Sequence, residues 1–253
     1  MKIEYRKRLV AFIDVLGFKN LVFSDDPDSI EKYYSFLLSK FADGAIKRSL
    51  EYLLVSDSIV IFCDDTQDNL FTLIEFTGLL QSGLLSEGII VRGAISRGDL
   101  FVDQENNIIV GEGLVHAFAL ESAAKYPRVI VDRNVIAHHY GTITNAINAT
   151  YSGSRPNLSI QSHNGGMSDY AYIHYGRILA HGVSAKPYEA ILQIFKREFY
   201  KNEHIEKFEW LRKYIKCALT ESIDYLAAKD APTKNERAKL KHNRRTVEAL
   251  SNL

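Results

Sequence analysis

The chain has 253 residues, of which 46% are hydrophobic and 25% are charged, a composition that allows one large domain with a sizeable core. Its formal net charge is zero, so no overall field attracts the chain to nucleic acid or to an anionic membrane, and we expect neither partner. The two cysteines, Cys63 and Cys217, lie far apart in the sequence, which indicates a reducing compartment without a disulfide framework. The first apolar run is too short to span a membrane and contains Asp14. We therefore expect a soluble cytoplasmic protein.

Hydrophobic periodicity predicts alternating strands and helices in the first half of the chain. The expected elements are a strand at 8–18, a helix at 30–50, a hairpin at 53–62, a helix at 69–85, strands at 89–96 and 101–110, a helix at 111–124, a strand at 127–131 and a short helix that Asp132 caps. This order predicts the α+β class, with a ferredoxin-like antiparallel sheet and helices packed on one of its faces.

The second half has a different composition. Residues 142–168 are rich in Asn, Ser, Gly and Thr, which is typical of a long excursion or loop. A strand is expected at 170–179 and helices at 187–201, 203–228 and 233–250, the last of them a basic and solvated tail. We expect a catalytic core at 1–140, and a loop, strand and helical C-terminal elaboration of the same domain at 141–253.

Two apolar stretches each carry one acid at their centre. Residues 12–19 read FIDVLGFK around Asp14, and residues 53–62 read LLVSDSIVIF around Asp57, which we place near the tip of the hairpin. A lone carboxylate is costly to bury in an apolar strand unless something pairs with it. A divalent metal bound by both acids would be such a partner. Alternatively, either acid could be an edge residue that faces water.

Four segments, in order and spacing, resemble motifs of the class III nucleotide cyclases. Residues 12–18 resemble the first metal-binding motif and residues 56–59 (SDSI) the second, while 91–98 (VRGAISRG) and 111–121 (GEGLVHAFALE) are similar to the strand and helix that complete the site. The resemblance covers about residues 8–132. It implies that Asp14, Asp57 and the backbone of Val15 hold Mn²⁺ or Mg²⁺, and that two head-to-tail protomers share each active site.

The departures from the cyclase pattern concern recognition of the base. The position that selects a purine is Leu53, with Tyr52 beside it, and the helix carries Val115 and Ala119 where the cyclases have an asparagine and an arginine. This combination resembles the pyrimidine cyclases of bacterial antiphage defence, in which cyclic CMP or cyclic UMP activates a separate effector without required direct contact. Tyr52 would then fill the room that a purine needs.

The resemblance implies roles for a further set of residues. Arg97 is the preferred catalytic cation beside Asp14 and Asp57, ahead of Lys19, Arg92 and Arg128. The expected substrate-binding residues are Val15, Gly17, Phe18, Lys19, Tyr52, Leu53 and Ser56.

Histidines and cysteines receive no role. No Cys/His spacing is typical of zinc, and His138 and His139 are adjacent, so they should point in different directions on a helix and make poor joint ligands.

The function that these residues predict is a homodimeric, metal-dependent pyrimidine nucleotide cyclase acting on CTP or UTP. Two alternatives remain open at this stage. The chain could be a degenerate cyclase-fold sensor that binds a nucleotide without catalysis, or a nucleotidyltransferase related to polymerase palm domains.

Overall fold

The computed structural model describes residues 2–23, 28–152, 155–156, 158–161, 170–177, 186–198 and 204–253. The chain divides into two compact units: unit 1 comprises Met1–Leu80 and Val91–His174, and unit 2 comprises Gln81–Ile90 and Tyr175–Leu253. Residues 141–174, which we expected in the C-terminal elaboration, belong to unit 1. That the two units form one domain stays a prediction.

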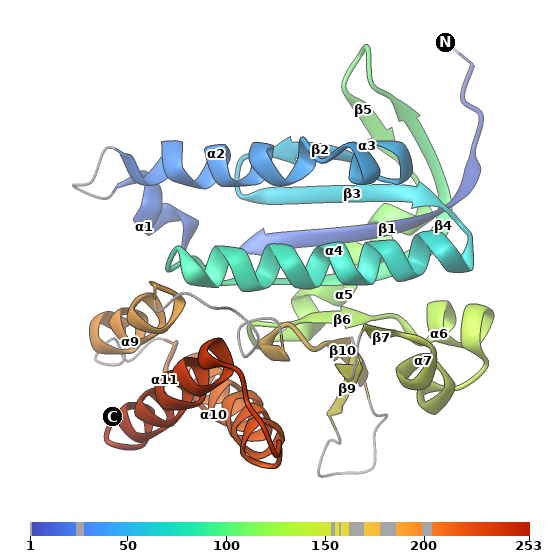
Figure 1. Cartoon of the computed structure of the whole chain (residues 1–253). Helices are drawn as coiled ribbons and strands as arrows, with labels where there is room; N and C mark the ends of the chain where they lie inside the picture. The colour runs from blue at the N-terminus through green and yellow to red at the C-terminus, as the bar shows by residue number, and fades with distance from the viewer. Residues whose placement is uncertain are drawn as a thin grey trace. The chain divides into compact units, whose positions relative to one another are not determined.

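The sheet of unit 1 follows the order β2-β3-β1-β4-β6-β10-β9, with β5 paired to β4 (Figure 1). Its strands are β1 (Arg6–Val15), β2 (Glu51–Val55), β3 (Ser58–Asp64), β4 (Val91–Asp103), β5 (Ile108–Val110), β6 (Val129–Val131), β9 (Leu158–Gln161) and β10 (Tyr170–Ile173). All pairs are antiparallel except β4 with β6. The α+β class and the 53–62 hairpin are therefore confirmed. The strands expected at 89–96 and 101–110 are instead one long strand, β4, and the short β5 antiparallel to its end.

The helices of unit 1 connect these strands and cover both faces of the sheet. They are α1 (Phe18–Val22), α2 (Asp28–Phe41), α3 (Gly44–Ser49), the first part of α4 (Gln67–Ser86), α5 (Glu112–Ala124), α6 (Arg133–Tyr140) and α7 (Ile143–Ala149), which is followed by the short strands β7 (Tyr151–Ser152) and β8 (Arg155–Pro156). The 142–168 excursion thus contains a helix, and its residues 153–154, 157 and 162–168 lie outside the described part.

Strand alternation explains why the helices are not confined to one face. Side chains at successive strand positions point to opposite sides, so Val10 packs with Ala117 of α5, whereas Tyr52 stacks on Phe41 of α2 from the other face. Phe41 in turn contacts Phe76 of α4. The expectation that all helices share one face is therefore wrong, because α5 covers the second apolar face that β1 and β4 present.

Helix α5 approaches strand β4 closely because two glycines face each other. A Cβ atom on Gly98 would lie 2.6 Å from the backbone nitrogen of Gly113, and the Ser96 hydroxyl donates a hydrogen bond to the Gly113 carbonyl oxygen. A side chain at Gly98 would overlap the backbone of α5, so it could be accommodated only by moving the helix. This contact fixes the height of α5 above the sheet.

We expect Gly98→Ala to lower the free energy of unfolding by about 1–3 kcal/mol, since the new methyl group overlaps backbone atoms that cannot rotate away. Urea denaturation measures the change. Gly44→Ala is the matched control, because a Cβ atom there meets nothing within 4 Å at the start of α3. Equal stability of the two variants would contradict the steric argument.

Unit 2 is built mainly from α9 (Lys186–Glu198), α10 (Ile205–Ala227) and α11 (Lys234–Ser251). Tyr188 of α9 donates a hydrogen bond of 2.6 Å to the buried Asn243 of α11, and Thr233 and Glu236 form a capping box that begins α11. Leu250 is fully buried, so the expectation that the last helix is a solvated tail is wrong. Residues 199–201 of the predicted 187–201 helix lie outside the described part.

Candidate functional site

Antiparallel pairing of β1 with β3 brings the two predicted acids together. Asp14 lies opposite Ser58, and the backbone N–H of Val15 donates a 3.2 Å hydrogen bond to the carbonyl oxygen of Asp57. Ser56 adopts a φ of 55° in the hairpin turn, and its carbonyl oxygen accepts a hydrogen bond from Tyr34. The carboxyl groups of Asp14 and Asp57 are close enough for the charge of Asp57 to raise the pKa of Asp14. The geometry therefore provides two adjacent carboxylates at one end of the sheet.

The electrostatic environment of this pair is unfavourable for charge. Burial, together with the negative charges of Asp57 and Glu121, raises the pKa of Asp14 to about 6, although the guanidinium of Arg92 opposes the increase. A bound cation would relieve this repulsion. These two carboxylates are therefore expected to be more stable with a bound cation than without one.

Arg92 and Glu121 complete the charged cluster. Arg92 lies opposite Asp14 in the β1–β4 register, with its Nη2 atom 3.9 Å from Oδ2 of Asp14, and its Nε atom forms an ion pair with Glu121 of α5. The Glu121 side chain is only 4% exposed. Sequence reasoning gave Glu121 no role, although the acid ends the helix segment that resembles the cyclases.

Tyr33 of α2 is a second residue that the sequence did not indicate, because it reads there as an ordinary core position. Its side chain is buried, and its hydroxyl has no hydrogen-bond partner in the part of the chain that the structure describes. Burial and the charges of Tyr34, Asp57 and Asp14 raise the pKa of Tyr33 well above its ordinary value. Two carboxylates and a nearby hydroxyl supply the oxygen ligands and the hydrogen-bond partner that a hydrated cation needs. These residues therefore fit a divalent metal.

The chain turns sharply after Val15. Gly17 has a φ of 76° and precedes α1, Phe18 packs edge-on against Tyr33, and Lys19 is exposed. The first N–H groups of a helix have no partner within the helix. The Gly17–Lys19 segment therefore presents backbone donors and one exposed ammonium close to Asp14.

Two expected site residues, Tyr52 and Arg97, lie away from the Asp14–Asp57 pair. Tyr52 points to the opposite face, where its ring stacks on Phe41 with the ring centroids 3.8 Å apart, whereas Leu53 shares the face of Asp14. Arg97 lies opposite Leu9, five residues from Asp14, which is about 17 Å along the strand. Strand alternation and register, which sequence motifs do not specify, account for both outcomes.

Arg97 instead belongs to a second polar cluster. Its Nε atom donates a 3.0 Å hydrogen bond to Asp65, which also lies 2.9 Å from Nε2 of His139 and 4.0 Å from Nε2 of His138. Burial alone would raise the pKa of Asp65, but the hydrogen bonds from Arg97 and His139 outweigh it and lower that pKa. Although we expected the adjacent histidines to make poor joint ligands, both have Nε2 within 4.0 Å of the Asp65 carboxylate.

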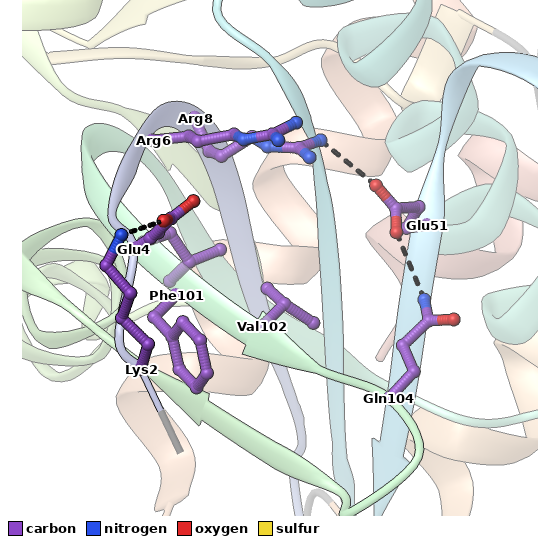
Figure 2. Close-up of a pocket in the computed structure, with 9 residues that line it drawn as sticks. Lys2, Glu4, Arg6, Arg8, Glu51, Phe101, Val102 and Gln104 are labelled. Carbon is purple, nitrogen blue, oxygen red and sulfur yellow. Dashed lines mark hydrogen bonds and ion pairs between the residues drawn. The ribbon is translucent and has the colours of Figure 1, made fainter.

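A pocket of about 500 Å³ lies at the other end of β1 and is separate from the acidic pair (Figure 2). Its lining residues are Lys2, Glu4, Arg6, Arg8, Glu51, Leu100, Phe101, Val102 and Gln104. Lys2 pairs with Glu4, and Glu51 binds both Arg8 and Gln104. Since most of its charges already satisfy one another, this pocket contributes no residues to the candidate site.

No protein-family model and no curated protein matches the chain. Solved structures that resemble it include the guanylyl cyclase Cya2 (12% identity, TM-score 0.45, covering 68% of this chain and 93% of that one) and the adenylyl cyclase CyaB from P. aeruginosa (14%, 0.44, 68% and 96%). A third is a guanylyl cyclase domain of the RhoGC fusion protein from the aquatic fungus Blastocladiella emersonii (13%, 0.48, 68% and 97%). Similarity at this level does not establish a family.

Among the residues described, no helix combines the length and the apolar character needed to cross a membrane.

Proposed function

We propose that this protein is a metal-dependent nucleotide cyclase, which converts a nucleoside triphosphate into the 3′,5′-cyclic nucleotide and pyrophosphate. The observation that carries the proposal is the Asp14–Asp57 carboxylate pair beside the Gly17 turn. Carboxylates on adjacent strands are the ligands that phosphoryl-transfer enzymes use for Mg²⁺ or Mn²⁺.

Each residue of the site has its own role in the proposed reaction. Asp14, Asp57 and the backbone of Val15 hold the metal, which when bound supplies charge stabilisation at the α-phosphate. The backbone donors of Gly17 and Phe18 and the ammonium of Lys19 bind the remaining phosphate oxygens. The ribose 3′-hydroxyl forms the new bond to the α-phosphorus, the bond to the bridging oxygen breaks, pyrophosphate leaves and the hydroxyl proton passes to water.

Arg92 is the guanidinium next to the metal ligands, and we assign it the role of orienting Asp14. Glu121 holds Arg92 in place from α5, so the ion pair keeps the carboxylate aimed at the site. Arg97 has no role in this mechanism, because it lies farther along β4 than Arg92 and its hydrogen bonds go to Asp65. The transition-state cation is then Lys19.

The base specificity that we propose is for a pyrimidine, CTP or UTP. Leu53 shares the face of Asp14 and offers no side-chain donor or acceptor to a purine edge. Tyr52 does not contact the base, since its ring stacks on Phe41. The cyclic CMP or cyclic UMP product would act in the cytoplasm as a second messenger of antiphage defence, through an effector that need not touch this protein.

We propose further that the active protein is a homodimer that shares its active sites. Val115 and Phe118 of α5 are 62% and 57% exposed, and Val110 just before the helix is 42% exposed. Phe118 packs edge-on against Phe12, two residues from Asp14, so this apolar surface adjoins the site. A second copy would bury it.

We expect Phe118→Glu to produce a monomer with cyclase activity reduced at least 100-fold, because a carboxylate cannot be buried in an apolar interface. Analytical ultracentrifugation and product assays measure the two effects. Leu38→Glu, at an exposed leucine of α2, is the control that should leave both unchanged. A Phe118→Glu protein that remains a fully active dimer would show that this surface is not the interface.

The proposed activity is tested by incubating the purified chain with each of the four nucleoside triphosphates and Mn²⁺, followed by mass spectrometry of the products. Cyclic CMP or cyclic UMP supports the proposal, and a cyclic purine nucleotide would keep the cyclase but overturn its base specificity. Saturable binding without product would favour a nucleotide sensor, an alternative that Val115 and Ala119 support because they lack the groups a catalytic helix supplies. A linear or oligomeric product would indicate a nucleotidyltransferase.

A further inference from the structure

Three side chains from two segments of unit 1 converge near the middle of β4. Asp65 precedes α4, and His138 and His139 lie in the last turn of α6. One ligand atom from each of the three lies within 4.8 Å of the others. We infer that Asp65, His138 and His139 form a second metal site, selective for Zn²⁺ or a similar transition metal.

The spacing of the ligand atoms is close to what such an ion requires. Ligands about 2.1 Å from a tetrahedral zinc ion are roughly 3.4 Å from one another. Oδ1 of Asp65 lies 2.9 Å from Nε2 of His139 and Oδ2 lies 4.0 Å from Nε2 of His138, so each histidine is within about 0.6 Å of that spacing from one carboxylate oxygen.

The backbone holds these residues in position without the ion. Thr66, next to Asp65, accepts a hydrogen bond from the backbone of Asn69 and begins α4. Asp132 caps α6 and donates its backbone N–H to the carbonyl oxygen of Ile95 on β4. Both ligand-bearing segments are thus tied to the sheet or to a helix start, which keeps the ordering cost of binding low.

Burial leaves one open side. The side chains of Asp65 and His139 are 8% and 5% exposed, whereas that of His138 is 49% exposed. An ion can therefore enter past His138, and its remaining coordination positions would face water or a ligand. A three-ligand set with an open position is the arrangement of reactive rather than purely structural zinc sites.

Arg97 supplies the positive charge when no metal is bound. Its guanidinium binds Asp65 and lies 3.4 Å from Nε2 of His138, so it occupies two of the three contacts that the ion would make. Metal binding must displace it. Arg97 is therefore a competitor for the site, and removing it should strengthen binding, whereas a merely structural ion pair would only be lost.

The donor set distinguishes this site from the Asp14–Asp57 pair. Two imidazoles and one carboxylate favour Zn²⁺ or Co²⁺, whereas an all-oxygen site favours Mg²⁺ or Mn²⁺. The inference is independent of the proposed cyclase activity, because its readout is metal binding alone.

The experiment is a titration of the untagged, metal-free full chain with Co²⁺, followed by its visible absorption, and a Zn²⁺ competition assay with a chromophoric chelator. We expect one Co²⁺ with the intense bands of a four- or five-coordinate site. Asp65→Asn and His139→Ala should weaken Zn²⁺ binding at least 100-fold, and the exposed His138→Ala about 10-fold or more. Arg97→Gln should tighten it about 10-fold.

Asp57→Asn is the control for the other site and should leave the Co²⁺ bands intact. The inference is overturned if His138→Ala and His139→Ala bind Zn²⁺ as the unaltered chain does, if the bands disappear in Asp57→Asn, or if Arg97→Gln binds no more tightly. Circular dichroism shows whether each variant is folded. If the buried substitutions unfold the chain, the Zn²⁺ affinity of the exposed His138→Ala variant tests the inference by itself.

Discussion

Asp57→Asn is expected to reduce cyclase kcat/KM at least about 1,000-fold, equivalent to about 4 kcal/mol of transition-state stabilisation. The substitution keeps the shape of the side chain but removes one of the two negative charges that hold the metal. The hairpin itself should persist, because its contact with β1 runs through the Asp57 carbonyl oxygen and the Val15 N–H. Product formation at saturating Mn²⁺ measures the loss.

Asp64→Asn is the matched control for this result. Asp64 is the last residue of β3, the strand that begins just after Asp57, and its exposed carboxylate pairs with Arg8. Arg8 retains its second partner, Glu51, so neither fold nor activity should change by more than a small factor. Equal activity of the two variants would remove the carboxylate pair from the mechanism and, with it, the basis of the proposed function.

Asp14→Asn is expected to stabilise the metal-free chain at pH 8 while abolishing its stabilisation by Mn²⁺. The pKa of Asp14 is raised from an ordinary 3.8 to about 6, so its ionised form is strained in the folded state. Because the group is half-buried and solvent screens part of the effect, we expect a gain of about 1–2 kcal/mol in the free energy of unfolding. Urea denaturation with and without Mn²⁺ measures both effects.

The same carboxyl group predicts a pH dependence of stability. Between pH 3.8 and about 6 the folded state binds more protons at Asp14 than the unfolded state, so the stability that this group contributes falls as the pH rises through that window. The Asp14→Asn chain lacks this term. Its advantage over the unaltered chain should therefore be absent near pH 4, grow up to about pH 6 and stay constant above.

A Mn²⁺ response that survives in Asp14→Asn would show that this carboxylate does not hold the metal. A variant that is less stable than the unaltered chain at pH 8 would show that Arg92 favours the ionised form of Asp14 more than burial and the neighbouring acids oppose it. These two outcomes are separable, since the first concerns the ligand and the second the metal-free protein.

Function and stability are opposed in this part of the molecule. Asp14 and Glu121 both lie beside the Arg92 guanidinium, Asp57 adds a third negative charge near Asp14, and the buried Tyr33 hydroxyl has no hydrogen-bond partner among the described residues. A chain selected only for stability would place hydrophobic side chains there. The arrangement is typical of sites in which a ligand supplies what the protein lacks.

The sequence by itself determined the order of the main strands and helices up to residue 140 and the proximity of the two acids. Local patterns carry that information: β-branched and apolar runs specify strands, glycine specifies the turn after Val15, and a short polar centre specifies a hairpin that places Asp57 at its tip. Once β1 and this hairpin pair in the antiparallel sense, Asp14 and Asp57 have to meet.

Only the tertiary structure decided which side chains share a face and which segments distant in sequence converge. A shift of one residue in a strand reverses the direction of a side chain, so Tyr52 and Leu53 are equivalent in a motif but lie on opposite faces of the sheet. Glu121 reaches Arg92, and His138 and His139 reach Asp65, through packing of α5 and α6 against strand β4 or its neighbours. Such contacts depend on helix position over a sheet, which no local pattern encodes.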